Sequence, residues 1–259
     1  MPQSQTTEMK NYVLSVNAEG ASSVVLVCEH ASNHIPAELE DLGLSEDARA
    51  SHAAWDPGAM AVATRMARIL DAPLIANGVS RLVYDCNRPP TASDAMLARS
   101  EVIDIPGNQS LTQADRDVRT EAYYRPFEAA LRSVVQRAAD AVLVTVHSFT
   151  PVYHGVYRPV EIGILHDSDT RLADTMLQSA TSHTNANVQR NAPYGPQDGV
   201  THTLKEHGLK GGHLNVMLEI RSDLIETPAQ QGAMAAMIAH WIADACAHLS
   251  VPGDVQCRA

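Results

Sequence analysis

The sequence predicts a single three-layer α/β/α domain, in which helices cover both faces of a mixed, mostly parallel sheet. The chain has 259 residues, of which 45% are hydrophobic, and this is enough for one large buried core. Short apolar runs alternate with longer segments of helical periodicity, which is the pattern of an α/β fold. Several runs are apolar throughout, as expected of strands that are covered on both faces.

Six apolar runs predict the strands of this sheet, and four of them lead into polar residues that can do chemistry. Ligands of open α/β sheets bind at the carboxyl ends of the strands. These polar endings are therefore candidates for one functional site. The six runs are residues 24–28, 73–76, 82–84, 141–146, 161–165 and 216–220.

Five segments with helical periodicity predict the helices. The first, residues 57–70, follows Asp56 as a predicted N-cap residue and has Pro57 at its first position. A long helical region over residues 112–139 is expected to bend at Pro126, because proline removes a backbone hydrogen bond. The remaining helices are expected over residues 171–179, 200–207 and 229–249, and the Ala/Met-rich face of the last is either core or a homo-oligomer surface.

Composition sets the limits of the domain and the class of partner. Residues 1–20 are expected to be a loosely ordered N-terminal segment, residues 21–250 the catalytic domain and residues 251–259 a tail. The net charge of −11 argues against nucleic acid as a partner. No run is long enough to span a membrane, and the start lacks the apolar stretch of a secretory signal. Four cysteines without CxxC spacing predict reduced thiols in a cytoplasmic protein.

The polar strand endings contain the residue types of a hydrolytic metal site. His30 follows the first strand and His147 the fourth, and imidazole is a usual ligand of Zn²⁺. A zinc-activated water needs a general base, for which Glu219 in the last strand is the candidate. His34 forms an HxxxH pair with His30, but Asn33 and Pro36 indicate a loop, so His34 stays doubtful.

Cationic and amide side chains near the same endings predict a site for a substrate carboxylate. Asn87 and Arg88 follow the third strand and offer fork-like donors, and Arg81 or Arg221 can add a second cation. The turn around Tyr194 can present its hydroxyl over the substrate.

Each candidate also has a purely structural interpretation. Asp56 before Pro57 is an ordinary capping residue, and Arg88 can form a surface ion pair. Cys28 and Cys86 adjoin the predicted site, but without a placed base they are assigned to packing. Surface positions are also expected for five histidines that the site does not use, His154, His183, His207, His240 and His248.

Five sequence blocks resemble the N-formylglutamate amidohydrolase family, and they occur in the same order as in that family. They are CEHASNHIP, HAAWDPGA, SRLVYDCNRP, VHSF and LEIRSDL, and they span residues 24–225. The resemblance implies metal-dependent hydrolysis of N-formyl-L-glutamate to formate and L-glutamate, a reaction associated with histidine degradation.

The layout is also similar to the zinc carboxypeptidase and aspartoacylase architecture. Its early histidine, Asn-Arg pair, His-Ser pair and Glu-x-Arg motif are matched by His30, Asn87-Arg88, His147-Ser148 and Glu219-x-Arg221. The chain departs from that pattern at Asn33, where the architecture has a glutamate ligand three residues after the histidine. The third ligand must therefore come from another segment: Asp56 is the first choice, Glu29 the second and His52 the third.

The resemblance implies a role for each candidate. His30, His147 and Asp56 would hold Zn²⁺ or another divalent ion, and Glu219 would act on water. Arg81, Asn87 and Arg88 would bind substrate carboxylates, with Ser148, Tyr194 and Arg221 as orienting groups. Two alternatives stay open: hydrolysis of another N-acyl amino acid or a C-terminal peptide bond, and a non-catalytic binding protein of the same fold.

Overall fold

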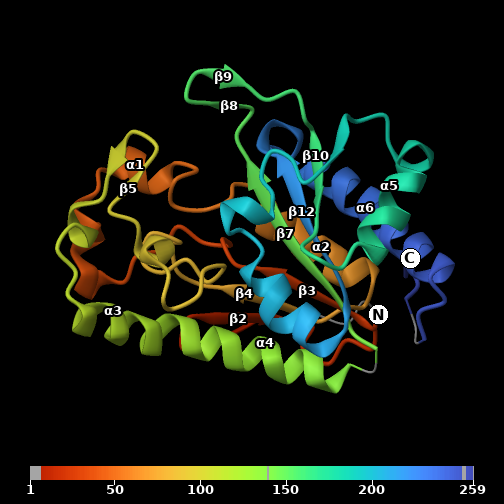
Figure 1. Cartoon of the computed structure of the whole chain (residues 1–259), viewed down its shortest axis with the longest axis horizontal. Coiled ribbons are helices and arrows are strands. Elements are labelled where there is room, and N and C mark those ends of the chain that lie inside the picture. Colours follow the sequence, from red (N-terminus) through yellow and green to blue (C-terminus); the bar gives the residue numbers. More distant parts are fainter. Residues whose placement is uncertain (1–6, 139, 253–254, 259) are drawn as a thin grey trace.

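The computed structural model describes residues 7–138, 140–252 and 255–258, and an eight-stranded sheet runs through the middle of the molecule (Figure 1). The strand order is β1-β2-β4-β3-β7-β12-β10-β11. The strands are β1 Thr7–Lys10, β2 Val13–Val16, β3 Val24–Cys28, β4 Leu74–Asn77, β7 Val142–Phe149, β10 Ile162–Leu165, β11 Val188–Arg190 and β12 Leu214–Arg221.

The four central strands β4, β3, β7 and β12 are parallel, and the antiparallel pairs lie toward the edges. β3 and β7 are buried along their whole length, which explains why their sequences are apolar runs without alternation. The predicted mixed, mostly parallel sheet is confirmed.

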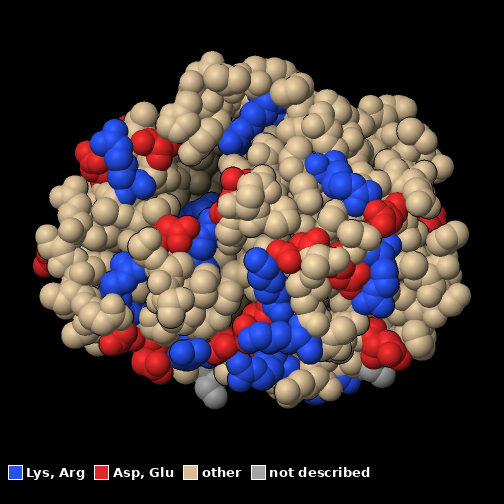
Figure 2. All heavy atoms as spheres, viewed as in Figure 1, with Lys and Arg blue, Asp and Glu red and all other residues tan. Residues whose placement is uncertain are grey.

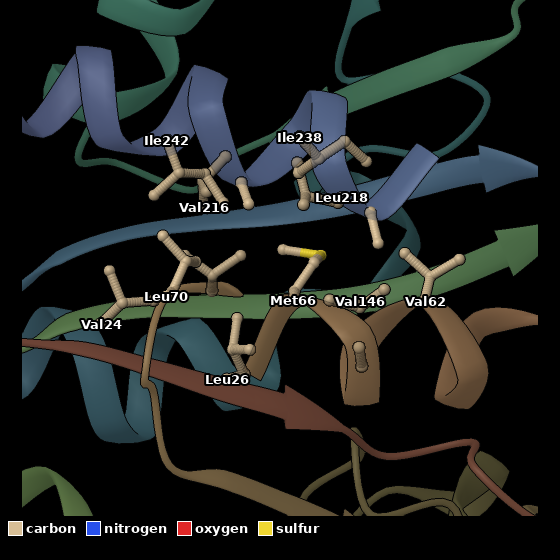
Figure 3. Close-up of a cluster of buried hydrophobic side chains, with 14 of the residues drawn as sticks. Val24, Leu26, Val62, Met66, Leu70, Val146, Val216, Leu218, Ile238 and Ile242 are labelled. Carbon is tan, nitrogen blue, oxygen red and sulfur yellow. The ribbon is translucent and has the colours of Figure 1, made fainter. Parts of the chain in front are cut away.

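Helices cover both faces of the sheet. On one face lie α2 (Ala59–Ile69), α5 (Arg171–His183) and α6 (Pro228–His248), whose buried residues share one core with the strands. Figure 3 shows this core, in which Met66 of α2, Ile238 of α6 and Leu26 of β3 come together. The buried residues of α6 belong to this core.

The other face is covered mainly by α4 (Arg125–Arg137), which continues from α3 (Gln113–Arg119) through a π-helical segment (Figure 1). A bend was expected at Pro126, but the irregular part lies before the proline: Thr120–Tyr124 form the π-helical segment, and Pro126 stands in the first turn of α4. The remaining short elements are α1 Glu46–Ala50, a second π segment at Leu204–Gly208, the hairpins β5 (Arg99–Ser100)/β6 (Ile103–Asp104) and β8 (Val152–Tyr153)/β9 (Val156–Tyr157), and 3₁₀ turns at Ala37–Gly43, Ser93–Met96, Pro106–Asn108, Pro196–Asp198, Leu209–Gly211 and Ser222–Leu224.

The prediction of a strand at residues 82–84 is wrong. This apolar run is buried, but it forms a turn in which the amides of Val83 and Tyr84 bond to the carbonyl oxygen of Ser80. The Ser80 hydroxyl also accepts from the amide of Leu82, so these backbone donors are satisfied locally. Apolar composition reports burial and cannot by itself distinguish a buried strand from a buried turn.

The expected start of the first helix is also corrected. α2 begins at Ala59, and its N-cap is Gly58, which adopts a left-handed conformation with φ 82°. A side chain at Gly58 would be strained and would meet the carbonyl oxygen of Ile225. The Asp56 carboxylate therefore does not cap this helix and is free for another purpose.

Strand pairing reaches into the segment that was expected to be loosely ordered. β1 and β2 pair with each other, and β2 pairs with β4, with Val13 and Val16 buried. This corrects the expectation from Thr7 onward, while residues 1–6 lie outside the described residues. In the expected tail, Val255 and Cys257 pack against the core. Among the residues that the structure describes, none of the helices combines the length and apolar character needed to cross a bilayer.

His207 was expected at the surface, but it is 9% exposed in the π segment that covers the sheet. Burial lowers its pKa to about 4, because a charged imidazole loses hydration there. Between about pH 4 and pH 6.5, His207 is therefore neutral in the folded protein but protonated in the unfolded chain, where its pKa is near 6.5.

This burial predicts a pH-dependent stability. As the pH falls from about 6.5 to about 4, the unfolded chain gains a proton on His207 that the folded chain does not. The free energy of unfolding should fall by about 3 kcal/mol more for the wild type than for His207→Gln. Chemical denaturation of both proteins across this range measures the difference, and parallel pH profiles would contradict the assignment.

Candidate active site

Two histidines and an aspartate converge at the carboxyl ends of the central strands. Nδ1 of His147 lies 2.9 Å from Oδ2 of Asp56, and Nδ1 of His30 lies 3.2 Å from the same oxygen. The two Nδ1 atoms are 3.2 Å apart. All three side chains are almost fully buried, at 2–4% exposure. Nδ1 of His30, Nδ1 of His147 and Oδ2 of Asp56, which all carry lone pairs, thus lie close together around one buried point.

The parallel register of the sheet explains part of this convergence. β7 lies between β3 and β12, and Glu219 pairs directly with His147. On the other side Val27 pairs with Thr145, two residues before Glu29 and His147. A row of polar side chains therefore crosses three neighbouring strands on one face of the sheet. His147 and Ser148, expected just after a strand, lie within β7.

Asp56 reaches the histidines through the loop that leads into α2. Its backbone amide bonds to the carbonyl oxygen of His30 at 3.0 Å, which joins this loop to the end of β3. The backbone amide of Ser148 donates to the Asp56 carboxylate at 3.3 Å, and the Ser148 hydroxyl donates to Pro57 at 2.8 Å. Ser148 thus connects β7 to the start of α2 and holds Asp56 in place.

Each histidine has a carboxylate at its second nitrogen. Nε2 of His30 bonds to Oδ1 of Asp85 at 2.8 Å. Nε2 of His147 lies 3.1 Å from Oε2 of Glu29, a close ion-pair contact that is not aligned as a hydrogen bond. A carboxylate at Nε2 favours the tautomer that carries hydrogen there, which leaves the lone pair on Nδ1. Both histidines are therefore prepared to bind a cation through Nδ1.

The donor set fits a divalent ion. Donors about 2.0–2.1 Å from a tetrahedral zinc are ~3.3 Å from one another. The three contacts among Nδ1 of His30, Nδ1 of His147 and Oδ2 of Asp56 are 2.9–3.2 Å. Without a cation or a shared proton, these lone pairs would repel one another. The buried His–Asp–His group can therefore hold a metal ion.

Buried carboxylates give this cluster a negative character. When protons instead of a metal ion occupy the cluster, the charge of His30 and hydrogen bonds donated by Nδ1 of both histidines hold the pKa of Asp56 well below its usual range, although burial alone would raise it. Burial likewise opposes ionisation of Asp85, but His30 and Arg81 keep its pKa well below normal. Arg81 contacts both acids, Asp85 at 3.1 Å and Asp56 at 3.6 Å. Its charge is shared between the two carboxylates.

Glu219 faces the same cavity but is not committed to a partner. It is 5% exposed, and its Oε2 has no hydrogen-bond partner among the described residues. Burial and the nearby charge of Asp56 raise the pKa of Glu219 to about 7, although His147 and His30 oppose the rise. A carboxyl group with this pKa can both accept and donate a proton near neutral pH.

A cavity of about 400 Å³ opens above these groups, and its walls include every predicted site residue except Arg221. Figure 2 shows the hollow, with basic and acidic atoms side by side at its rim. The volume lies in the range of small-molecule sites.

Asn87 and Arg88 line the cavity, but most of their donors and acceptors already bind the chain. The Asn87 amide donates to the carbonyl of Val200 at 2.6 Å and accepts from the amide of Thr203 at 3.0 Å. Arg88 pairs with Asp94 at 2.7 Å. Its guanidinium also donates to the backbone carbonyl of Asn87 and to the carbonyls of residues 198 and 199. The predicted carboxylate-binding pair thus holds the 198–203 loop against the cavity.

Arg221 lies outside the cavity lining. Its guanidinium pairs with Asp223 at 2.8 Å and Glu161 at 3.3 Å, and donates to the hydroxyl of Tyr157 and the carbonyl of Arg158. These bonds hold the base of the β8–β9 hairpin, so Arg221 supports the cavity wall without facing the cavity.

Tyr194 lines the cavity, and Gly163 allows its loop to come close. Gly163 pairs with Glu219 in the sheet, and a Cβ at Gly163 would overlap the carbonyl oxygen of Ala192. Only glycine lets this loop pack directly beside the strand of the candidate base. The Tyr194 hydroxyl accepts a hydrogen bond from Arg158 at 3.0 Å.

The alternative residues are placed elsewhere. Glu29 contacts the far side of His147 and not the Nδ1 atoms. His52 pairs with Glu101 at 3.1 Å on the cavity wall, and His34 is exposed in a loop. Cys28 and Cys86 are fully buried, and burial raises the pKa of both thiols well above normal, which agrees with packing.

Three contributors to the site were not predicted. Asp85 lies within the block SRLVYDCNRP, but its spacing in the sequence gives no sign that it would reach His30. Arg158 and Glu101 lie in hairpins whose sequences carry no motif. Glu101 accepts from the backbone amide of His154 at 3.0 Å, so it joins the β5–β6 hairpin to the β8–β9 hairpin beside the cavity. Only the folded chain reveals these contacts.

Comparisons with known proteins show the family and the fold of this chain. The family model described as N-formylglutamate amidohydrolase matches residues 22–226. A solved gene product of Agrobacterium tumefaciens is 50% identical with a TM-score of 0.90, covering 92% of this chain and 96% of that chain. N-formylglutamate amidohydrolase from Ralstonia eutropha JMP134 is 18% identical with a TM-score of 0.63, covering 91% and 97%, and it shares the fold. No curated protein matches the sequence.

The carboxylate at Nε2 of His30 predicts a measurable effect on metal binding. Asp85→Asn should weaken zinc affinity about 10- to 100-fold, because the amide no longer favours the tautomer with its lone pair on Nδ1. Competition with a chromophoric chelator measures the affinity. Asp244→Asn is the matched control, since Asp244 lies 3.5 Å from His183 outside the site. Equal affinities for the wild type and Asp85→Asn would contradict the role.

Proposed function

Because the chain belongs to the N-formylglutamate amidohydrolase family, we propose that it is a metal-dependent enzyme that cleaves N-formyl-L-glutamate into formate and L-glutamate. One observation carries the proposal: three buried donor atoms of His30, His147 and Asp56 converge in the cavity that Glu219 also lines, and the Oε2 of Glu219 has no hydrogen-bond partner among the described residues. This combination suits hydrolysis of an amide by an activated water.

His30, His147 and Asp56 would hold the ion, for which Zn²⁺ is the first choice. When bound, a divalent ion supplies Lewis acidity, which makes water more acidic and polarises a carbonyl group. The protein's contribution is to hold the donors in place: Asp85 and Glu29 orient the imidazoles, and the amide of Ser148 orients Asp56.

Glu219 would move the proton. Its free Oε2 takes a proton from the attacking water as the new C–O bond forms at the formyl carbon. The same proton then passes to the amide nitrogen as the C–N bond breaks, which releases formate and the amine. A pKa near 7 suits both steps, because the group must gain and lose a proton at the same pH.

Arg81 would bind a carboxylate of the substrate near the reacting centre. It is 26% exposed toward the cavity while it contacts Asp56 and Asp85, so it brings positive charge into an acidic site. Without it, the carboxylates of the cluster would repel an anionic substrate. Asn87 and Arg88 would act mainly by shaping the wall around that substrate.

The proposed function also implies a pathway and a cellular compartment. Hydrolysis of N-formyl-L-glutamate would place the enzyme in histidine degradation, and the cysteine pattern favours the cytoplasm.

The general-base role predicts that Glu219→Gln lowers kcat by about 10²- to 10⁴-fold, because the amide cannot accept the proton from water. Elemental analysis should still find one ion per chain, since Glu219 is not among the three converging donors. Glu206→Gln is the matched control, because Glu206 pairs with Lys210 away from the cavity. Unchanged turnover in Glu219→Gln with the ion bound would show that another group moves the proton.

The substrate assignment predicts a preference for the formyl group and for glutamate. Turnover should be highest for N-formyl-L-glutamate in a series of N-formyl, N-acetyl and N-succinyl amino acids. The 400 Å³ cavity limits the size of what can bind beside Glu219. Initial rates of the metal-loaded enzyme measure this preference, and equal rates across the series would defeat the assignment.

A further inference from the structure

Arg158 stands at the base of the β8–β9 hairpin, which projects above the carboxyl end of β7 (Figure 1). Its backbone is fixed at both ends. The amide donates to the carbonyl of Pro151 at 2.8 Å, and the carbonyl accepts from Arg221 at 3.3 Å. The position of this residue is therefore set by the fold and not by its own side chain.

Aromatic rings surround the Arg158 guanidinium. Its central carbon lies 4.4 Å from the ring centre of Tyr153, 5.0 Å from that of Tyr194 and 5.7 Å from that of Phe149. All three rings line the cavity. Such a cage restricts the rotation of the side chain and removes part of its hydration. The cation is thus pre-organised beside the cavity.

No acid neutralises this cation. Its guanidinium donates to the hydroxyl of Tyr194 at 3.0 Å and to the carbonyl of Thr150 at 3.5 Å, both uncharged. Among the described residues, no carboxylate pairs with Arg158. The two arginines that line the cavity differ from Arg158 beside it, because Arg81 contacts Asp56 and Asp85 and Arg88 pairs with Asp94. Of these three arginines, Arg158 is the one whose charge no described carboxylate pairs with.

Tyr194 connects this cation to the reacting groups. Burial raises the pKa of its hydroxyl, and Glu219 adds to the rise, while Arg158 and Arg81 both oppose it. The ring is therefore within electrostatic reach of the candidate base and of both arginines. A ligand that extends from Arg81 past Tyr194 would meet Arg158.

We propose that Arg158, oriented by the Tyr194 hydroxyl and the aromatic cage, binds the side-chain carboxylate of the substrate and so selects acidic N-acyl amino acids. The inference rests on the proposed amidohydrolase function and adds the residue that reads the side chain. A guanidinium binds carboxylate through two parallel hydrogen bonds, and such charged bonds discriminate strongly against a neutral group of the same shape. Arg81 remains for the carboxylate near the scissile amide.

The experiment compares N-formyl-L-glutamate with N-formyl-L-glutamine, which has nearly the same shape but no side-chain charge. In the metal-loaded wild type, kcat/KM should favour glutamate, and Arg158→Gln should reduce this ratio about 10- to 100-fold. Arg158→Lys keeps the charge without the planar fork, and Tyr194→Phe removes the orienting hydroxyl, so both should give intermediate ratios. Arg68→Gln removes the same charge from the exposed side of α2 and should keep the wild-type ratio.

Binding provides a second readout that does not need turnover. By calorimetry, Arg158→Gln should weaken binding of glutarate about tenfold more than binding of its monoamide. A glutamate-to-glutamine ratio that stays the same in Arg158→Gln, with an unchanged Tm, would overturn the proposal. If the wild type cleaves neither formyl compound, the proposed function fails, and glutarate binding then decides on Arg158 alone. Equal glutarate affinities for the wild type and Arg158→Gln would overturn the inference, and a selective loss would support it.

Discussion

The mutual repulsion of three buried lone pairs is the constraint on which the rest of this structure depends. Two imidazole nitrogens and one carboxylate oxygen lie within 3.2 Å of one another, away from solvent. Such an arrangement is stable only with a positive charge at its centre, supplied by a proton or by a metal ion. The surrounding groups prepare the cluster for that charge, because acids stand behind both imidazoles and a serine amide holds the central carboxylate.

The register of the central strands places two glutamates on either side of His147. Glu29 directly follows β3, His147 lies in β7 and Glu219 in β12, so the two acids flank the histidine on opposite sides. The two glutamates differ in surroundings. Glu29 contacts a ring nitrogen and its pKa is lowered by His147 against the effect of burial, whereas Glu219 faces the cavity and its pKa is raised. One residue type thus supplies a fixed anion at Glu29 and, in the proposed function, a proton-transfer group at Glu219.

The four arginines in and around the site also differ in their surroundings. Arg88 and Arg221 bind acids and backbone carbonyls, and they hold the loops that form the cavity wall. Arg81 shares its charge with two acids of the cluster, and Arg158 is caged by rings without an acid. Of these four arginines, Arg81 and Arg158 are therefore the two that we propose as partners of the two carboxylates of N-formyl-L-glutamate.

The sequence by itself determined the α/β class, the main strands and the polar residues at their ends, because hydrophobic periodicity is a local property of the chain. It could not distinguish the buried turn at residues 82–84 from a strand, since burial alone produces the same apolar pattern. Only the tertiary structure decided that Asp56, and not Glu29, meets both Nδ1 atoms. It also decided that Arg221 supports a hairpin while Arg158 faces the aromatic cage. These outcomes depend on the register of the strands, on where α2 begins and on the paths of the loops. Contacts between segments that are distant in the sequence determine all three.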